Sequence, residues 1–132
     1  MTYFDSVKVK NDLGLTDTSQ DVNIQNWGSK ADAMVDDLLY EVATKNAKQS
    51  QLPSLPLVTP TQSIKDASSD FTKAEYFAYI RDWEAHKTYK EKATDAIKQF
   101  VIRLRTDAEI YGSVIGDKIV RTNTFVSYIP ST

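Results

Sequence analysis

The residues whose types and spacing could do chemistry in this chain form one acidic group. Its members are Asp32, Asp36, Asp37 and Glu41. The first two are four residues apart, which places two carboxylates on one face of a helix, where they could bind a divalent metal ion. The four side chains nevertheless spread over about 180° of a helical wheel, so the pattern favours a solvated outer face over a metal site.

Other catalytic groups are sparse. His86 is the only histidine, and no Ser/His/Asp spacing surrounds it, so it is interpreted as a surface or interface residue. The absence of cysteine excludes a thiolate nucleophile, a cysteine-ligated metal and a disulfide framework. The glycines are scattered, and the Glu-x-x-Glu motif of all-helical nucleotide pyrophosphohydrolases is missing. The sequence therefore predicts a protein that is not an enzyme and uses no metal or cofactor.

Basic residues concentrate in the second half of the chain. Residues 87–105 hold six bases against two acids, whereas residues 1–50 hold eight acids against five bases. The formal net charge of -2 is too small for a general nucleic-acid binder, so we expect two surfaces of opposite sign instead. The candidate interface residues on these surfaces are Lys87, Lys90, Asp36, Asp37 and Glu41.

Two helices are expected in the first third of the chain. The first spans residues 5–13, with Asp5 or Ser6 as its cap and Gly14 at its end. The second runs from about Ser19 to Asn46. Its apolar residues fall within an arc of about 140°, the stripe of a core-facing helix, and they are Ile24, Trp27, Ala31, Met34, Val35, Leu38, Leu39 and Val42.

A long loop and a further helical region follow. Residues 47–70 contain three prolines and no helical or strand period, which predicts a loop. A helix start is predicted at Thr72, since Thr72 and Glu75 match a capping box while Phe71 and Tyr76 match a hydrophobic staple.

Heptad spacing then continues from Tyr76 to Tyr111. An unbroken helix would be about 60 Å long, so it either breaks near residues 86–89 or protrudes and meets another subunit. We expect burial at the centre of each stripe, at Trp27, Leu38, Trp83 and Leu104.

The C-terminal sequence has a different character, being rich in β-branched and aromatic residues without a helical period. A lone strand has no partner in a helical chain, so we expect it to pair with another chain or dock in an apolar groove rather than form a free tail. The candidate interface residues there are Ile119, Val120, Phe125, Val126, Tyr128 and Ile129.

Length and composition fit one modest hydrophobic core, with 132 residues of which 41% are hydrophobic. The predicted fold class is all-α, a bundle of three to four helices with a long Pro-rich loop and an extended C-terminal arm. Residues 1–116 form the helical domain in this interpretation, and residues 117–132 form the arm. No stretch matches a signal peptide or a membrane span, so we expect a soluble protein made in a cytoplasm, without a membrane partner.

The order of these elements resembles the head-tail connector (adaptor or head completion) family of long-tailed bacteriophages and related viruses. The likeness rests on a short helix ending in VKNDLGLTDTSQD, a long helix with the sequence IQNWGSKADAMVDDLLYEVA, and the later stretch AIKQFVIRLRTDAEIYG. The resemblance implies a ring-shaped homo-oligomer, dodecameric in this family, in the neck of the virion after assembly in the host cytoplasm. Its implied partners are the portal protein, a stopper or tail-side neck protein, and passing DNA that is bound without sequence specificity.

Oppositely charged faces and a tail strand without a partner are also what head-to-tail ring assembly requires. The alternative hypothesis is a helical regulatory or nucleic-acid-binding module that uses the basic face of residues 87–105, including Lys98, Arg103 and Arg105. A steep loss of DNA affinity with salt, in a protein that is monomeric or dimeric, would favour this alternative.

Overall fold

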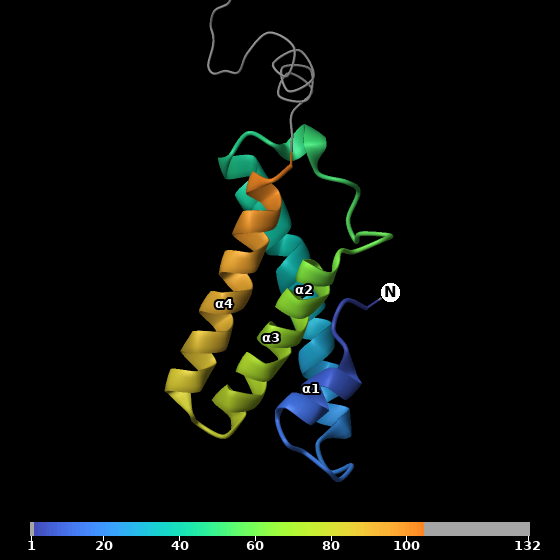
Figure 1. The fold of residues 1–132 in the computed structure, drawn as a ribbon, viewed down its shortest axis with the longest axis vertical. Helices are drawn as coiled ribbons and strands as arrows, with labels where there is room; N and C mark the ends of the chain where they lie inside the picture. The colour runs from blue at the N-terminus through green and yellow to red at the C-terminus, as the bar shows by residue number, and fades with distance from the viewer. Residues whose placement is uncertain (1, 105–132) are drawn as a thin grey trace, which may run out of the picture.

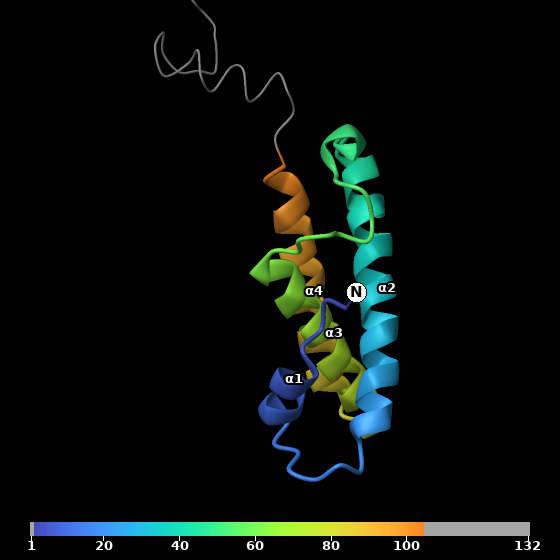
Figure 2. The ribbon, with the colours of Figure 1, turned by 90° about the vertical axis from the view of Figure 1, so that its right-hand side faces the viewer.

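The computed structural model of the chain describes residues 2–104 and shows a helical bundle (Figure 1). Helices α2, α3 and α4 pack along one another, and the short α1 lies against α2 and α3 at one end (Figures 1 and 2). No strand occurs within residues 2–104, which confirms the all-α prediction for this part of the chain. The elements are α1 (Ser6–Asp12), α2 (Asp21–Lys45), a short 3₁₀ helix (Gln49–Gln51), α3 (Gln62–Tyr79) and α4 (Trp83–Ile102).

The predicted C-terminal arm lies outside the described residues, as does the boundary between residues 116 and 117. The same holds for the candidate interface residues Ile119, Val120, Phe125, Val126, Tyr128 and Ile129.

The predicted start and end of α1 are confirmed. The Asp5 carboxylate accepts hydrogen bonds from the backbone N–H groups of Val7 and Lys8, both at 3.1 Å. These bonds satisfy donors that have no partner within the helix. Gly14 follows the helix with a φ of 72°, a left-handed conformation that glycine adopts without steric cost.

Helix α2 supplies the longest apolar stripe, and the stripe predicted from the sequence faces the core. From Ala31 onward its buried members pack with Phe71 of α3, the largest fully buried side chain in the described residues, and with Ile97 of α4. Ile24, nearer the start of α2, packs instead with Phe4 and Val9. Trp27, Met34 and Leu38 lie at the margin of the stripe and are half-buried. The fully covered members of the predicted stripe are Ile24, Ala31, Val35, Leu39 and Val42.

The predicted boundary between the loop and the next helix is wrong. Helix α3 begins at Gln62, where the Thr61 hydroxyl accepts a hydrogen bond from the backbone N–H of Ile64 at 3.4 Å. Thr72 is not a cap but a fully buried residue within α3, and its hydroxyl donates to the backbone carbonyl of Ser68 at 2.9 Å. The polar run before Phe71 resembles a loop in the sequence, but it is helical because other helices cover it and supply hydrogen-bond partners.

The heptad pattern belongs to two helices rather than one. Helix α3 ends at Tyr79, Arg81 adopts a φ of 62° in the turn, and α4 returns antiparallel to α3 (Figure 1). The break therefore precedes the predicted position at residues 86–89. The predicted burial of Trp83 is also wrong, because this residue begins α4 at the end of the bundle and is 61% exposed.

Substitutions at Phe71 and Trp83 test which of these two aromatic residues belongs to the core. The Phe71→Ala substitution should lower the free energy of unfolding by about 3–5 kcal/mol, because it removes a fully buried ring from the centre of the core. The matched Trp83→Ala substitution should change it by only about 0.5 kcal/mol. Urea unfolding followed by circular dichroism measures both values, and equal losses would contradict the assignment.

Candidate functional site

Asp32 forms hydrogen bonds within the helical bundle. One carboxylate oxygen, Oδ1, accepts hydrogen bonds from the backbone N–H groups of Tyr3 at 3.1 Å and Phe4 at 3.2 Å. The same oxygen accepts a bond of 2.6 Å from the Ser68 hydroxyl. Asp32 therefore joins the N-terminal segment to α2 and α3, and its predicted place on a solvated outer face is wrong.

Asp36 also binds within the subunit, through the side chain of Tyr3. The Tyr3 hydroxyl donates to Asp36 Oδ1 at 2.7 Å and accepts a bond of 2.7 Å from the backbone N–H of Leu57. Burial and the bond to Asp36 together raise the pKa of Tyr3 to about 12. The phenol thus holds the proline-containing connection after α2 against the bundle, and the outer-face prediction is wrong for Asp36 as well.

The other two acids of the group do lie on the exposed side of α2. Asp37 is exposed, and Glu41 forms an ion pair of 3.0 Å with Lys45 one turn later. Within residues 2–104, no three or more His, Cys, Asp or Glu side chains are grouped so that they could hold a metal ion.

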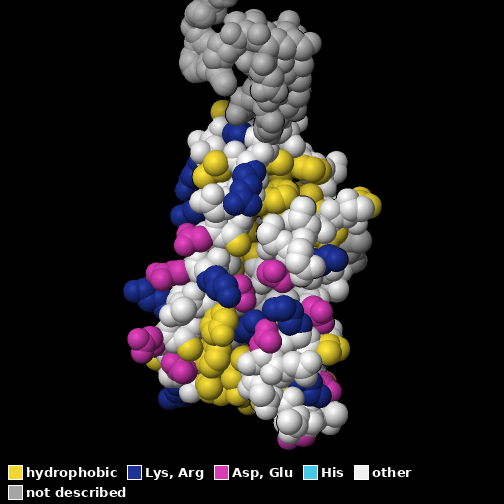
Figure 3. Space-filling view, viewed as in Figure 1, with side chains coloured by type: hydrophobic (Ala, Val, Ile, Leu, Met, Phe, Trp, Pro, Cys, Tyr) yellow, Lys and Arg dark blue, Asp and Glu magenta, His cyan; other side chains and the backbone are white. Residues whose placement is uncertain are grey.

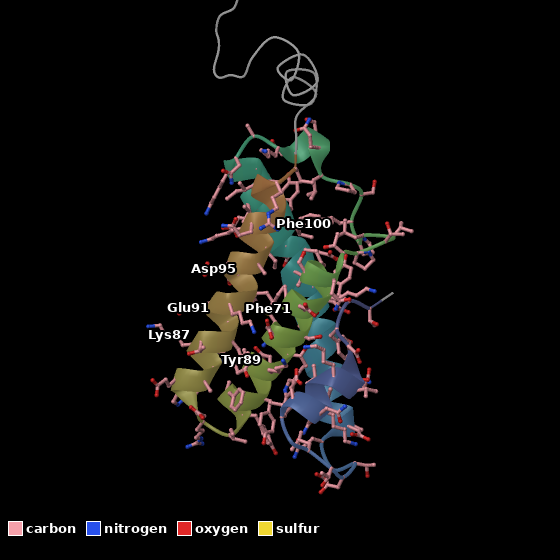
Figure 4. All side chains as sticks on the ribbon, viewed as in Figure 1. Phe71, Lys87, Tyr89, Glu91, Asp95 and Phe100 are labelled. Carbon is pink, nitrogen blue, oxygen red and sulfur yellow. The ribbon has the colours of Figure 1, made fainter. Side chains whose placement is uncertain are left out.

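The predicted basic face lies along the exposed side of α4. Lys87, Lys90 and Lys98 are exposed there, and none of them forms an ion pair with another described residue. Glu91 and Asp95 lie between them, and side chains of both signs occur along this side of the molecule (Figures 3 and 4). The face is therefore mixed in charge rather than purely basic.

A charged cluster connects three helices, with Lys73 and Asp70 buried and Asp12 and Lys92 at the surface. Lys73 of α3 is buried, and its Nζ lies 2.6 Å from Asp12 Oδ2 at the end of α1. The same Nζ lies 3.4 Å from Asp70 Oδ1, one turn earlier in α3. Lys92 of α4 approaches Asp70 Oδ2 at 3.9 Å, and both lysines lie within 6.0 Å of the centre of the Tyr89 ring.

The pKa shifts in this cluster show how its charges are balanced. Burial raises the pKa of Asp70 in spite of the two neighbouring lysines, whereas the hydrogen bond from Lys73 lowers the pKa of Asp12. Burial alone would lower the pKa of Lys73, but its bonds to the two carboxylates outweigh that effect and raise it. Asp70 is the buried carboxylate of the cluster, and Lys73 and Lys92 offset part of the cost of its burial.

Sequence reasoning missed this cluster because it placed Asp70 in a loop. Asp70 and Lys73 are three residues apart, the spacing of a helical ion pair, and this signal is visible once α3 is extended back to Gln62.

Large apolar side chains are exposed where α3 turns into α4. Tyr79 and Ile80 are 58% and 47% exposed, and Trp83 follows them in the chain. Trp27 of α2 packs beside this turn, with its ring centre 5.4 Å from that of Tyr79. We call these four residues the aromatic end; hydrophobic side chains gather over this part of the molecule in Figure 3. Exposed apolar patches mark interaction sites in soluble proteins.

His86 lies at the edge of the aromatic end. Its ring is 5.8 Å from that of Trp83, and its Nδ1 is 2.8 Å from the backbone carbonyl oxygen of Ala74. The residue is half-buried, and this contact joins α4 to α3.

No family model, curated protein or solved structure matches this chain. Among the helices that the structure describes, none is both long and apolar enough to cross a membrane.

The charged cluster predicts that replacing the buried Lys73 strongly lowers the free energy of unfolding. The Lys73→Met substitution should lower the free energy of unfolding by about 3–5 kcal/mol, because it leaves the buried Asp70 without its nearest cation. The matched Lys30→Met substitution removes an exposed ion pair with Glu75 and should cost about 0–1 kcal/mol. Denaturant unfolding at neutral pH compares the two, and a Lys73 loss no larger than the Lys30 loss would contradict the role of the cluster.

The raised pKa of Tyr3 predicts that the folded protein loses stability at alkaline pH. The folded state holds the phenol proton more tightly than the unfolded state, whose tyrosine pKa is about 10. The contribution of Tyr3 is therefore complete below pH 10 and is lost as the pH rises to about 12. Melting temperatures measured across this interval should fall more steeply for the native chain than for the Tyr3→Phe variant. Lys73, whose pKa is also raised, affects both proteins, so parallel curves would show that Tyr3 makes no such contribution.

Proposed function

We propose that this chain is a structural subunit of a viral head-tail connector, which forms a homo-oligomeric ring below the portal around the DNA exit channel. The observation that carries the proposal is the presence of unlike exposed surfaces on one small subunit. The aromatic end lies at the turn between α3 and α4, while the outer sides of α2 and α4 carry charged residues. Ring assembly by head-to-tail contact requires one surface of a subunit to meet a different surface of the next copy.

The charged contact between copies involves fewer acidic residues than the sequence alone predicted. Asp36 is bound by Tyr3, so the exposed acids of the group on α2 are Asp37 and Glu41, of which Glu41 also pairs with the exposed Lys45. In the proposed ring they face Lys87 and Lys90 of the next copy. Exposed ion pairs contribute only about 0–1 kcal/mol each, so they select the register of the contact rather than drive assembly.

The proposal also includes the C-terminal sequence and the partners of the ring. Residues 117–132 serve as an extended arm beyond the helical domain of residues 1–116, and the apolar residues of the arm contribute to contacts with other chains. The ring lies in the neck of the virion, with the portal on one side and a stopper or tail-side neck protein on the other. DNA passes through it without base-specific contacts, and the subunit carries out no chemistry.

Imaging and binding measurements on the purified protein test the proposal. Negative-stain micrographs should show closed rings, and the rings should bind the portal of the same virus. A monomeric or dimeric protein that binds DNA with a steep loss of affinity as salt rises would instead support the nucleic-acid-binding alternative, in which Lys87, Lys90 and Lys98 contact phosphates.

Charge reversal tests the register of the ring. The Asp37→Lys and Glu41→Lys double variant should weaken ring formation, because like charges would then face each other across the contact. Adding Lys87→Glu and Lys90→Glu in the same chain should restore it. Size-exclusion chromatography with light scattering measures the ring fraction of both proteins. Failure of the fourfold variant to recover rings, while its helix content is unchanged, would exclude this pairing.

A further inference from the structure

The aromatic end exposes large apolar side chains of the kind that form protein interfaces. Tyr79, Ile80 and Trp83 are each roughly half exposed or more, although they are among the larger apolar side chains of the chain. Tyr79 packs on Trp27, whose ring centre lies 5.4 Å from that of Tyr79 and 6.1 Å from that of Tyr76, and the Trp83 ring lies 5.8 Å from that of His86. A fixed group of aromatic rings is the usual anchor of a protein interface.

The chain itself contains a segment with the chemistry to cover this surface. Twenty-eight residues follow Leu104, and they include a run of apolar and β-branched residues with few charges. Such a segment gains free energy by burying its side chains on an apolar surface. Its apolar members are Ile119, Val120, Phe125, Val126, Tyr128 and Ile129.

The length of the chain beyond Leu104 allows this contact. Leu104 and the aromatic end lie at opposite ends of α4, which is about 30 Å long at 1.5 Å per residue. The twelve residues 105–116 can span about 40 Å when extended, which exceeds the length of α4.

The charged residues on the exposed side of α4 disfavour docking of the C-terminal segment on its own chain and favour docking on a neighbouring copy. A segment returning to its own aromatic end along this side would pass Lys87, Lys90, Glu91, Asp95 and Lys98 and would remove charged groups from water. A segment that reaches the next copy avoids this cost. The contact joins two different surfaces, so it can repeat from copy to copy and close a ring.

We propose that residues 117–129 of one copy dock on the aromatic end of the next copy, with Trp83 as the anchor of the contact. This inference rests on the proposed ring assembly, and it assigns the surface that the C-terminal segment occupies within it.

Photo-cross-linking in the full-length chain tests the contact directly. Trp83 is replaced by the photoreactive residue benzoylphenylalanine, and light and heavy-isotope chains are mixed, assembled, irradiated and analysed by mass spectrometry. We expect cross-links from position 83 to residues 117–129 that join a light chain to a heavy chain. The matched control places the same photoreactive residue at Tyr40, which is 62% exposed on α2 and should give no such cross-link. Cross-links within single chains only, or an equal yield from position 40, would overturn the proposal.

A double-mutant cycle supplies a second measurement. The Trp83→Ala and Phe125→Ser substitutions should each raise the dissociation constant for self-association about tenfold, and the double variant should be no weaker than either one. Additive effects would show that the two side chains do not meet.

The outcomes separate this inference from the proposed function. Rings that bind portals but give no cross-link at residues 117–129 would overturn the docking and leave the connector role intact. Cross-linked copies that neither close into rings nor bind portals would support the docking and overturn the connector role.

Discussion

The complete burial of the middle of α3 is the constraint on which the rest of the structure depends. This helix is covered by α1, α2 and α4, so its polar residues as well as its apolar ones lose contact with water. A buried polar group without a partner costs free energy, and each of these residues must therefore find one within the bundle. The buried polar residues are Ser68, Ser69, Asp70, Thr72 and Lys73.

The partners of these residues explain how the smaller elements are positioned. Ser68 donates to Asp32 of α2, and the Ser69 hydroxyl accepts from the backbone N–H of Asp5, the N-cap of α1. Lys73 holds the end of α1 through Asp12. A helix as short as α1 is marginal by itself, so these contacts, with Phe4 packed on Gly28, keep it in place. In residues 2–104, the one buried side-chain polar atom without a partner is Gln51 Oε1, outside this region.

The same constraint leaves the outside of the bundle free for other contacts. The inner polar residues find their partners within residues 2–104. Lys87, Lys90 and Lys98 on the exposed side of α4 take no part in the ion pairs around Asp70, whereas the exposed Lys92 does. Trp83 lies beyond the covered part of α3, so its ring contributes little to the core. The residues that stabilise the bundle and the residues on its outer surface are therefore largely different, so substitutions at Asp37, Lys87 or Lys90 should leave the fold unchanged.

The sequence by itself determined the features that depend on neighbouring residues. The apolar stripe of α2, the Asp5 cap and the Gly14 end follow from local spacing and backbone preference, and the structure confirms them. Tertiary structure determined the features that depend on contacts between helices, namely the start of α3 and the partners of the acidic residues on α2. Serine and aspartate normally indicate loops because they compete for backbone hydrogen bonds, but neighbouring helices supplied their partners and made residues 62–71 part of α3. Tertiary contacts also bind Asp32 to Ser68 and Asp36 to Tyr3. Helical spacing alone could not predict these contacts, because it shows which face a residue shares and not what covers that face.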